Sequence, residues 1–242
     1  MTANKIAALT IALVLLGFTS VGYAEDKPKP DKDGFVSMFD GESLKGWQAI
    51  PADCEDAWYI KDGYIVGEGD KGRGYLSYHQ GDIADFEMKF RYRFPGKGNS
   101  GVNIRSIKDK TGKRHFQSYH ADIGNIGIGK NVLGAWDFHT PERKEHGVPR
   151  GKRLVIDEND KAEYTDIDNP TTLDDISEKG WNKCHIVAKG NKFTFYLNGK
   201  LTAEFVEHLP AKKRLHKGTI QLQLHDPKMF VHFDDLKIKI MK

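Results

Sequence analysis

Three short segments place side chains that can exchange protons at alternate positions. They read NSGVNIR at residues 99–105, YHADIG at 119–124 and QLQLH at 221–225. Successive side chains of a strand point to opposite faces, so apolar residues at every second position assign the polar ones to the other face. That face is expected to carry Asn103, Arg105, His120, Asp122, Gln221, Gln223 and His225.

Together these residue types suit a site for a neutral sugar. Arg, Asn and Gln offer planar donors and acceptors, and one carboxyl group with two imidazoles can move protons. A solvated strand face is the alternative for any one segment, but such faces usually carry Lys, Glu and Thr, so three agreeing segments favour a site. The tryptophan of GAWDFH either stacks on a sugar or packs in the core. The candidate catalytic residues are Arg105, His120, Asp122 and His225, and the candidate substrate-binding residues are Asn99, Asn103, Trp136 and Gln223.

A different catalytic arrangement is contained in the motif E-x-D-x-x-E, formed by Glu158, Asp160 and Glu163. Glucanases with a related sandwich use such a motif on a strand, with two carboxylates about 5 Å apart as nucleophile and acid. The surrounding sequence, DENDKAEYTD, is charged and poor in core residues, which favours a chance match in a loop. We therefore expect these carboxylates not to converge on a cleft.

The composition fits one large folded domain. The chain has 242 residues, of which 38% are hydrophobic and 11% aromatic, enough to build a core. Its 37 basic and 34 acidic side chains alternate along the sequence, which argues against a nucleic-acid partner. The His residues are not at metal-ligand spacing and two Cys exclude a four-Cys zinc site, so no metal is assigned and any cofactor is left open.

Residues 1–24 are typical of a secretory signal peptide. Lys5 precedes an apolar run over residues 6–18, and small residues stand just before the expected cleavage point after Ala24. The apolar run is shorter than the roughly 20 residues that span a bilayer, so we expect cleavage and no stable membrane span. The mature protein would then be periplasmic or secreted.

The mature chain begins with a polar, Pro-containing segment, residues 25–33, which we expect to be a flexible leader. Export places the protein in an oxidising compartment. Cys54 and Cys184 either form a disulfide there or remain two separate thiols, because the sequence does not fix the distance between their Cα atoms.

From residue 34 onward the hydrophobic pattern has a period of two. With frequent Gly turns and almost no helical pattern, it predicts an all-β fold, a jelly-roll β-sandwich of two antiparallel sheets forming a single domain over residues 34–242. Segment 35–39 is expected beside the last strand, 230–240. The residues expected in the core are Phe86, Met88, Phe90, Tyr92, Val102, Ile104, Ile220, Leu222 and Leu224.

Three local features complete the prediction. Asn198–Gly199 supplies the two positive-φ positions of a type I′ turn in a hairpin over residues 192–205. A change of parity at Asp234–Asp235 indicates a β-bulge in the last strand. Residues 141–180 are markedly polar and are expected to form a long surface excursion across one end of the sandwich.

As a set, these segments resemble the secreted family named for 3-keto-disaccharide hydrolysis, also described by 3-keto-α-glucoside 1,2-lyase and 3-keto-2-hydroxyglucal hydratase activity. The resemblance covers about residues 34–242 and implies a concanavalin-like jelly roll that acts on a sugar oxidised at C3. Family members commonly carry Gln where this chain has His120. The segments that carry the resemblance are GFVSMFDGESLKGW (34–47), KDGYIVGEG (61–69), DFEMKFRYRF (85–94), GNSGVNIR (98–105), YHADIG (119–124), WNKCHIVAKGNKFTFYLNG (181–199) and GTIQLQLHDPKMFVHFDDLKI (218–238).

The resemblance implies a definite chemistry. A ketone at C3 acidifies the C2 proton, a base removes it, the C1 substituent leaves by elimination, and water adds back. Asp122 or His120 would be the base, Arg105 would hold the enolate oxygen, and His225 would act as acid or orient a partner. The competing interpretation is a non-catalytic, lectin-like carbohydrate-binding module, which needs the same face but no base.

Overall fold

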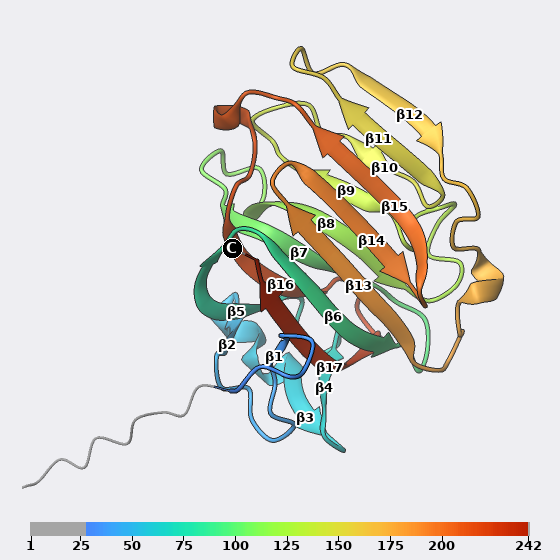
Figure 1. The fold of residues 1–242 in the computed structure, drawn as a ribbon. Coiled ribbons are helices and arrows are strands. Elements are labelled where there is room, and N and C mark those ends of the chain that lie inside the picture. Colours follow the sequence, from blue (N-terminus) through green and yellow to red (C-terminus); the bar gives the residue numbers. More distant parts are fainter. Residues whose placement is uncertain (1–27, 242) are drawn as a thin grey trace, which may run out of the picture.

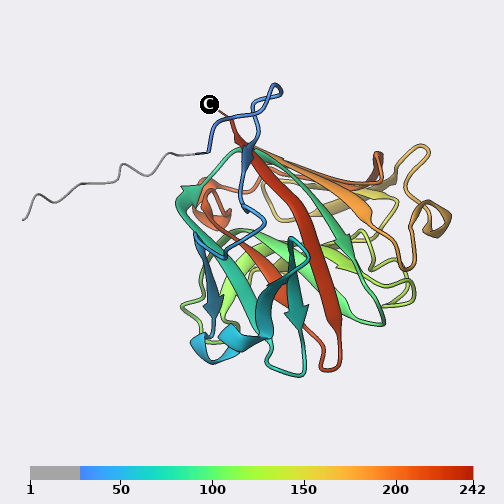
Figure 2. The same ribbon diagram turned by 90° about the horizontal axis from the view of Figure 1, so that it is seen from below.

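The computed structural model describes residues 28–241, so the predicted signal peptide and residues 25–27 lie outside the described residues. Within residues 28–241 the strands form two sheets, one of ten strands and one of seven, packed face to face (Figures 1 and 2). The prediction of an all-β jelly-roll sandwich is confirmed. No helix in this part of the chain is long and apolar enough to cross a bilayer.

The larger sheet runs from β12 to β3 in Figure 1. Its pairings are antiparallel except for β11 with β15, which is parallel. In spatial order its strands are β12 (Ala162–Asp166), β11 (Lys152–Ile156), β15 (Lys200–Glu207), β14 (Lys192–Leu197), β13 (Asn182–Lys189), β6 (Phe86–Arg93), β17 (Phe230–Ile240), β4 (Tyr64–Glu68) and β3 (Trp58–Lys61), with β1 (Val36–Ser37) pairing β17.

The smaller sheet lies behind the larger one in Figure 1 and carries the three polar segments. Three 3-10 turns, η1 (Ala52–Ala57), η2 (Leu173–Asp175) and η3 (Ala211–Lys213), are the described helical segments. In spatial order the strands of this sheet are β10 (Gly147–Val148), β9 (Trp136–His139), β8 (Phe116–Gly124), β7 (Asn99–Lys108), β16 (Gly218–Leu224), β5 (Gly74–Ile83) and β2 (Trp47–Ile50).

The core lies between the two sheets and follows the predicted alternation. Along β6 the side chains are alternately buried and half-buried, as the sequence 85–94 predicted. All nine residues expected in the core are at most 2% exposed. The two ends of the chain meet, because Val36 of β1 pairs with Ile238 of β17, which confirms the expected position of segment 35–39.

The local predictions of turns and bulges also hold. Asn198 and Gly199 connect β14 to β15 with φ of 49° and 86°. The register of β17 against β6 shifts between Asp234 and Lys237, and Asp235 has a φ of 49°, which marks the predicted bulge. In each case the sequence signal depends on neighbouring residues, so it does not require knowledge of the tertiary structure.

Residues 141–180 differ from the prediction of a surface excursion. They contribute β10 to the smaller sheet and β11 and β12 to the larger one. Leu154 and Ile156 of β11 are fully buried and pair in parallel with Phe205 and Glu207. Val148, Ile167 and Ile176 are also buried, but β12 at the edge of the sheet is largely exposed, so the segment's polar composition concealed its strands.

The two cysteines are separate in the described part of the chain. Cys54, in η1, and Cys184, on β13, are both buried free thiols. Each packs as a small apolar side chain, and burial raises the pKa of both thiols. Of the two arrangements that the sequence left open, the structure contains separate thiols. Nearer the start of the described chain, part of the expected leader is an ordered turn, in which Asp31 accepts backbone hydrogen bonds from Asp33 and Phe35.

Candidate functional site

A row of polar residues crosses the outer face of the smaller sheet, the face turned away from the core. Adjacent strands are in register along the row, so each residue stands beside the next. The row, here called the polar row, is Asp137 of β9, His120 of β8, Asn103 of β7, Gln221 of β16, Ser77 of β5 and Gln48 of β2. Three of its members come from the three polar segments of the sequence.

The outer face of this sheet is concave and partly covered. Tyr75 on β5 and Phe116 on β8 meet edge to face with ring centroids 5.5 Å apart, although β16 and β7 lie between their strands. Two side chains separated by two strands can meet only if the sheet curls toward them. The covering explains why His120 is 2% exposed on a face turned away from the core.

The ring of His120 lies directly over Gly101 of β7. A Cβ atom at Gly101 would stand 2.1 Å from Nε2 and 2.2 Å from Cε1 of the ring, so only glycine leaves the imidazole its place. On its other side the ring stacks against His139 of β9, with centroids 4.9 Å apart. Gly101, the glycine of the NSG segment, therefore leaves room for a histidine on the next strand, a role that the sequence alone did not reveal.

A chain of hydrogen bonds fixes the other edge of the His120 ring. Nδ1 of His120 lies 2.7 Å from Oδ1 of Asn103, and Nδ2 of Asn103 donates to Oε1 of Gln221 over 3.0 Å. The same Oε1 accepts the hydroxyl of Ser106 at 2.8 Å. Asn103 and Gln221 have no exposed surface, so this chain is a built-in part of the site.

Asp122 is the acid beside the imidazole. Its Oδ1 lies 3.5 Å from Nε2 of His120. Burial, with the nearby Asp137, raises the pKa of Asp122 well above its ordinary value, while burial and the neighbouring His139 lower the pKa of His120 well below its own. Burial therefore disfavours the charged form of both groups, a carboxyl group beside an imidazole.

Two further residues of the site were missed in the sequence, Asp137 and His139. Nε2 of His139 lies 3.3 Å from Oδ2 of Asp137. Burial would raise the pKa of Asp137, but the hydrogen bond and charges of His139 and His120 outweigh it and lower that pKa, so Asp137 is ionised. The alternation of WDFH, with Trp136 and Phe138 inward, is the sequence pattern that places Asp137 and His139 on the outer face.

His225, Asn99 and Gln223 lie around this centre. His225 stands just after β16, is exposed and bonds through Nδ1 to Asp226 at 2.6 Å, and its charge lowers the pKa of His120 further. The other oxygen of Asp226 accepts the backbone N–H of Asn99 at 2.8 Å. Gln223 is 9% exposed and pairs with Tyr75. These residues share the outer face, at the end where β7 begins.

Arg114 supplies a positive charge above the site. It lies in the connection between β7 and β8 and forms two hydrogen bonds to Glu145, of 3.0 and 2.9 Å. Burial is the main cause of the lowered pKa of His120, and the charge of Arg114 adds to it. The hydrogen bond to Glu145 is the main cause of the raised pKa of Arg114, with smaller contributions from Asp137 and Tyr75. The Arg114 side chain is partly exposed.

Arg105 is not on the outer face, and the prediction for it was wrong. The register of β7 against β8 shifts between Ile104 and Ile107, and Arg105 has a φ of 48°. At this bulge the strict alternation fails, so Arg105 follows Ile104 to the core side and Ser106 lies on the outer face, where its hydroxyl donates to Gln221.

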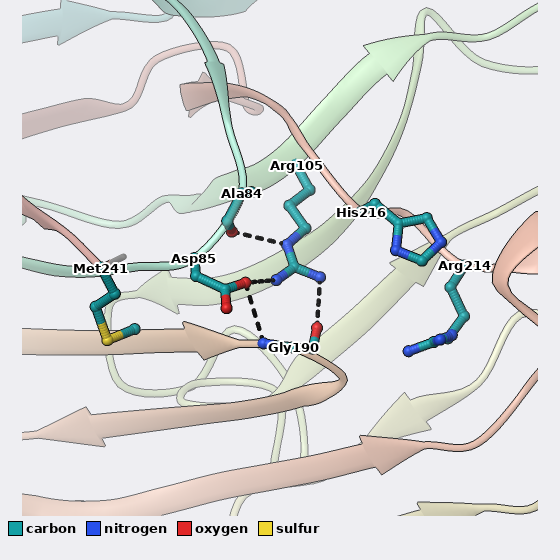
Figure 3. A pocket seen from close by; sticks show the side chains of 7 residues that line it. All are labelled: Ala84, Asp85, Arg105, Gly190, Arg214, His216 and Met241. Atoms are coloured by element: carbon teal, nitrogen blue, oxygen red, sulfur yellow. Dashed lines mark hydrogen bonds and ion pairs between the residues drawn. The ribbon is translucent and has the colours of Figure 1, made fainter.

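Instead, Arg105 fastens one end of the sandwich (Figure 3). Its guanidinium lies 4.7 Å from the centre of the Phe193 ring, and its side chain is 2% exposed. It lies at a surface depression of about 480 Å³ that Arg214 and His216 also line. Its hydrogen bonds go to the carbonyls of Ala84, Gly190 and Leu215, at 3.0, 2.8 and 3.0 Å, and to the carboxylate of Asp85 at 2.8 Å.

Trp136 is also not available to a sugar. It has no exposed surface, and its ring packs against Phe193, Phe195 and Phe205 between the sheets. Its indole N–H donates to the carbonyl of Ala203 at 3.3 Å. Of the two roles considered for this tryptophan, core packing is correct, because its position in β9 is inward.

The carboxylates of the E-x-D-x-x-E motif do not form a site, as expected. Glu158 is exposed in a turn, and Glu163 is exposed on the edge strand β12 of the larger sheet. Asp160 bonds to Nε2 of His146 at 2.8 Å. Among residues 28–241 no group of three or more His, Cys, Asp or Glu side chains is arranged to hold a metal ion.

Comparison with known proteins places the chain in a family. The 3-keto-α-glucoside-1,2-lyase-like domain matches residues 34–239. A 3-keto-disaccharide hydrolase from Bacteroides thetaiotaomicron is 30% identical over 79 residues. That match spans 30% of this chain and 27% of the hydrolase, so the hydrolase is a relative over only part of its length.

Solved structures with this fold include a β-glucanase and a domain determined in a sugar-bound form. A Parabacteroides distasonis protein, provisionally assigned as a glycosyl hydrolase, has a TM-score of 0.57, 18% identity and coverage of 87% of this chain and 95% of its own. The β-glucanase of Bacillus licheniformis has a TM-score of 0.51, 9% identity and coverages of 86% and 97%. The exoplasmic domain of VIP36, in a sugar-bound form, has a TM-score of 0.50 and 10% identity, and the match covers 88% of this chain and 91% of that domain. At these identities the likeness concerns the fold alone, whereas the match over residues 34–239 shows that the chain belongs to the family of 3-keto-α-glucoside-1,2-lyase-like domains.

Proposed function

We propose that this protein cleaves 3-keto-glycosides by removing the C2 proton, eliminating the C1 substituent and adding water back. The observation that carries the proposal is the pair formed by His120 and Asp122, an imidazole 3.5 Å from a carboxyl group on a covered face, where burial disfavours the charged form of each. An elimination needs one group that accepts a proton and one that donates a proton, and it needs no pair of ionised carboxylates.

The first half of the reaction uses both groups. Nε2 of His120 takes the C2 proton, the electron pair of the C–H bond forms the enolate, and the C1–O bond then breaks. Asp122 gives its proton to the departing oxygen, which leaves as an alcohol. After this half-reaction the imidazole is protonated, the carboxyl is ionised, and the sugar carries a double bond between C1 and C2 conjugated with its ketone.

The second half restores the starting state. The carboxylate of Asp122 takes a proton from water as the water oxygen bonds to C1, and the imidazolium of His120 returns a proton to C2. The sum is one glycoside and one water converted to a 3-keto sugar and an alcohol. Arg114, whose charge reaches His120 and Asp137, takes the part expected of Arg105 and stabilises the negative charge on the C3 oxygen.

The remaining polar residues supply binding. His225, Gln223 and Asn99 lie at the open end of the face, where they can hydrogen-bond the hydroxyls of the sugar or of its leaving group. Ser77 Oγ and Gln221 Nε2 are buried atoms of the polar row without a hydrogen-bond partner among the described residues. Unpartnered polar atoms are rare in folded proteins, so a bound molecule or water is expected to satisfy them.

A lectin-like carbohydrate-binding module is the second candidate, because the sugar-bound domain of VIP36 has a similar fold. It would use the same hydrogen-bonding face without proton transfer. The two candidates differ in one observable, since a binder holds the 3-keto-glycoside without changing it.

The deciding experiment incubates the protein, residues 25–242, with 4-nitrophenyl 3-keto-α-D-glucoside in D₂O. The elimination route releases nitrophenol and leaves deuterium at C2 of the sugar, which NMR detects. Direct hydrolysis releases nitrophenol with hydrogen retained at C2, and binding alone releases nothing. The unoxidised glucoside is the control and should remain intact, because without the ketone its C2 proton is not acidic. A reaction without enzyme corrects for spontaneous exchange at C2.

A further inference from the structure

Three contacts hold the imidazole of His120 in one orientation. Gly101 lies beneath Nε2 and Cε1, and His139 stacks on the ring at 4.9 Å. The third contact is from Nδ1 to Oδ1 of Asn103, at 2.7 Å. A ring held in this way still has two neutral tautomers, with the proton on Nδ1 or on Nε2. Only the tautomer with a free Nε2 can take a proton on the side facing Asp122.

The partner of Nδ1 is the carbonyl end of the Asn103 amide. The amino end of that amide donates to Oε1 of Gln221, and Oε1 in turn accepts the hydroxyl of Ser106. An amide has one accepting and one donating end, so fixing the donating end toward Gln221 turns the accepting end toward His120. An acceptor at Nδ1 requires a proton on that nitrogen.

We propose that Asn103 is a positioning residue that selects the Nδ1–H tautomer of His120 and thereby leaves the lone pair of Nε2 facing Asp122. The inference deepens the proposed function, because it identifies which nitrogen acts. Asn103 itself touches no reacting atom. Asn103 acts through His120. Gln221, whose Oε1 also accepts the hydroxyl of Ser106, keeps the Asn103 amide from rotating by half a turn.

The tautomer decides whether this histidine can act. A histidine in that place is useful as a base only if its proton is assigned to the nitrogen away from the substrate. The groups that face the ring are His139 and Asp137 from β9, Asp122 from β8, His225 beyond β16 and Arg114 from the β7–β8 connection.

The test observes the tautomer directly and does not depend on turnover. In protein labelled with ¹⁵N-histidine, long-range ¹H–¹⁵N correlation spectra distinguish a protonated ring nitrogen from an unprotonated one. The wild-type spectrum is expected to show His120 with Nδ1 protonated and Nε2 unprotonated at pH 7. A spectrum with Nε2 protonated would overturn the inference without any variant.

Two substitutions extend the test. Asn103→Leu keeps the approximate volume and removes the acceptor, so the tautomer population should move toward Nε2–H. Asn103→Asp keeps an acceptor, so Nδ1–H should persist. With a 3-keto-glycoside, Asn103→Leu should lower kcat by about 10²-fold, the usual worth of a general base, with KM within about twofold. Asn103→Asp should recover most of kcat and shift the acid limb of the pH profile upward, because a carboxylate stabilises the imidazolium.

The outcomes separate the two proposals. If the tautomer follows Asn103 as described but no substrate is turned over, the positioning role stands and the proposed function fails. If Asn103→Leu leaves the tautomer unchanged, the positioning role is wrong whatever the activity. Should the leucine variant fail to fold, the wild-type and aspartate spectra still decide, since loss of Nδ1–H in either contradicts the inference.

Discussion

Nε2 of His120 and Oδ1 of Asp122 lie 3.5 Å apart on the concave face of the smaller sheet, where burial raises the pKa of the carboxyl and lowers the pKa of the imidazole. In water a carboxyl and an imidazole at this distance would exchange a proton and form an ion pair. Here the loss of hydration penalises both charged forms, so acid and base coexist unreacted. This relationship is the basis of the first three predictions.

Replacing His120 with Gln should remove the base while preserving a planar polar side chain. We expect kcat/KM for a 3-keto-glycoside to fall by about 10²-fold or more, with no change in melting temperature beyond a few degrees. His185→Gln is the matched control, because His185 lies on the larger sheet and bonds to Glu87. Equal activity of wild type and His120→Gln would assign the base to another residue.

Asp122→Asn should show its effect on the leaving group. The substitution keeps the shape of a neutral acid but removes its proton, so substrates that need protonation of the departing oxygen suffer most. We expect loss of turnover for a 3-keto-disaccharide and a much smaller loss for a nitrophenyl 3-keto-glucoside, whose leaving group needs little help. Equal losses with both substrates would mean that Asp122 does not act as the acid.

The same variant should change the dependence of stability on pH. Asp122 has a folded-state pKa above its ordinary value of 3.8, so between these two values the folded state binds more protons than the unfolded state. The contribution of Asp122 to the free energy of unfolding is therefore largest below pH 3.8 and declines as pH rises through the folded pKa. Asp122→Asn lacks this decline.

We thus expect Asp122→Asn to gain stability relative to wild type as pH rises from 4 to 8, measured by urea unfolding at each pH. His120, whose folded pKa is lowered, contributes the opposite slope, and it is present in both proteins. A difference in unfolding free energy that is constant with pH would show that Asp122 ionises normally in the folded state.

Gly101→Ala tests the space that the imidazole needs. The new Cβ would stand 2.1 Å from Nε2, so the His120 ring must move. We expect a large loss of activity with a destabilisation of about 1–3 kcal/mol, the usual cost of overpacking. Gly96→Ala is the control, because nothing lies within 4 Å of a Cβ there. An active Gly101→Ala enzyme would mean that the position of the ring is not critical.

Arg105→Ala should affect stability and leave substrate binding unchanged. The guanidinium is almost fully buried, and its removal takes away a donor from three backbone carbonyls and leaves Asp85 with only the backbone N–H of Gly190 among its hydrogen-bond donors shown in Figure 3. We expect a loss of about 3–5 kcal/mol in unfolding free energy, typical of breaking a buried pair, measured by urea denaturation. KM of the folded fraction should match the wild type, and a raised KM would return Arg105 to the site.

The sequence alone determined which side chains share a face. Alternation placed Asn103, His120, Asp122 and Gln223 opposite the core residues, because the two-residue period of a strand is a local property of its backbone. It also determined the turn at Asn198–Gly199, where the required positive φ depends only on the residues themselves.

The tertiary structure alone decided which of these faces became a site. The bond between Asn103 and Gln221 joins residues 118 positions apart, and no local pattern specifies that β7 and β16 are neighbours. The bulge that turns Arg105 inward follows from the register between β7 and β8, which is likewise set by pairing. The opposed pKa shifts of His120 and Asp122 arise from burial under the curled sheet, a property of the assembled fold, because removal of water depends on every strand that closes around the pair.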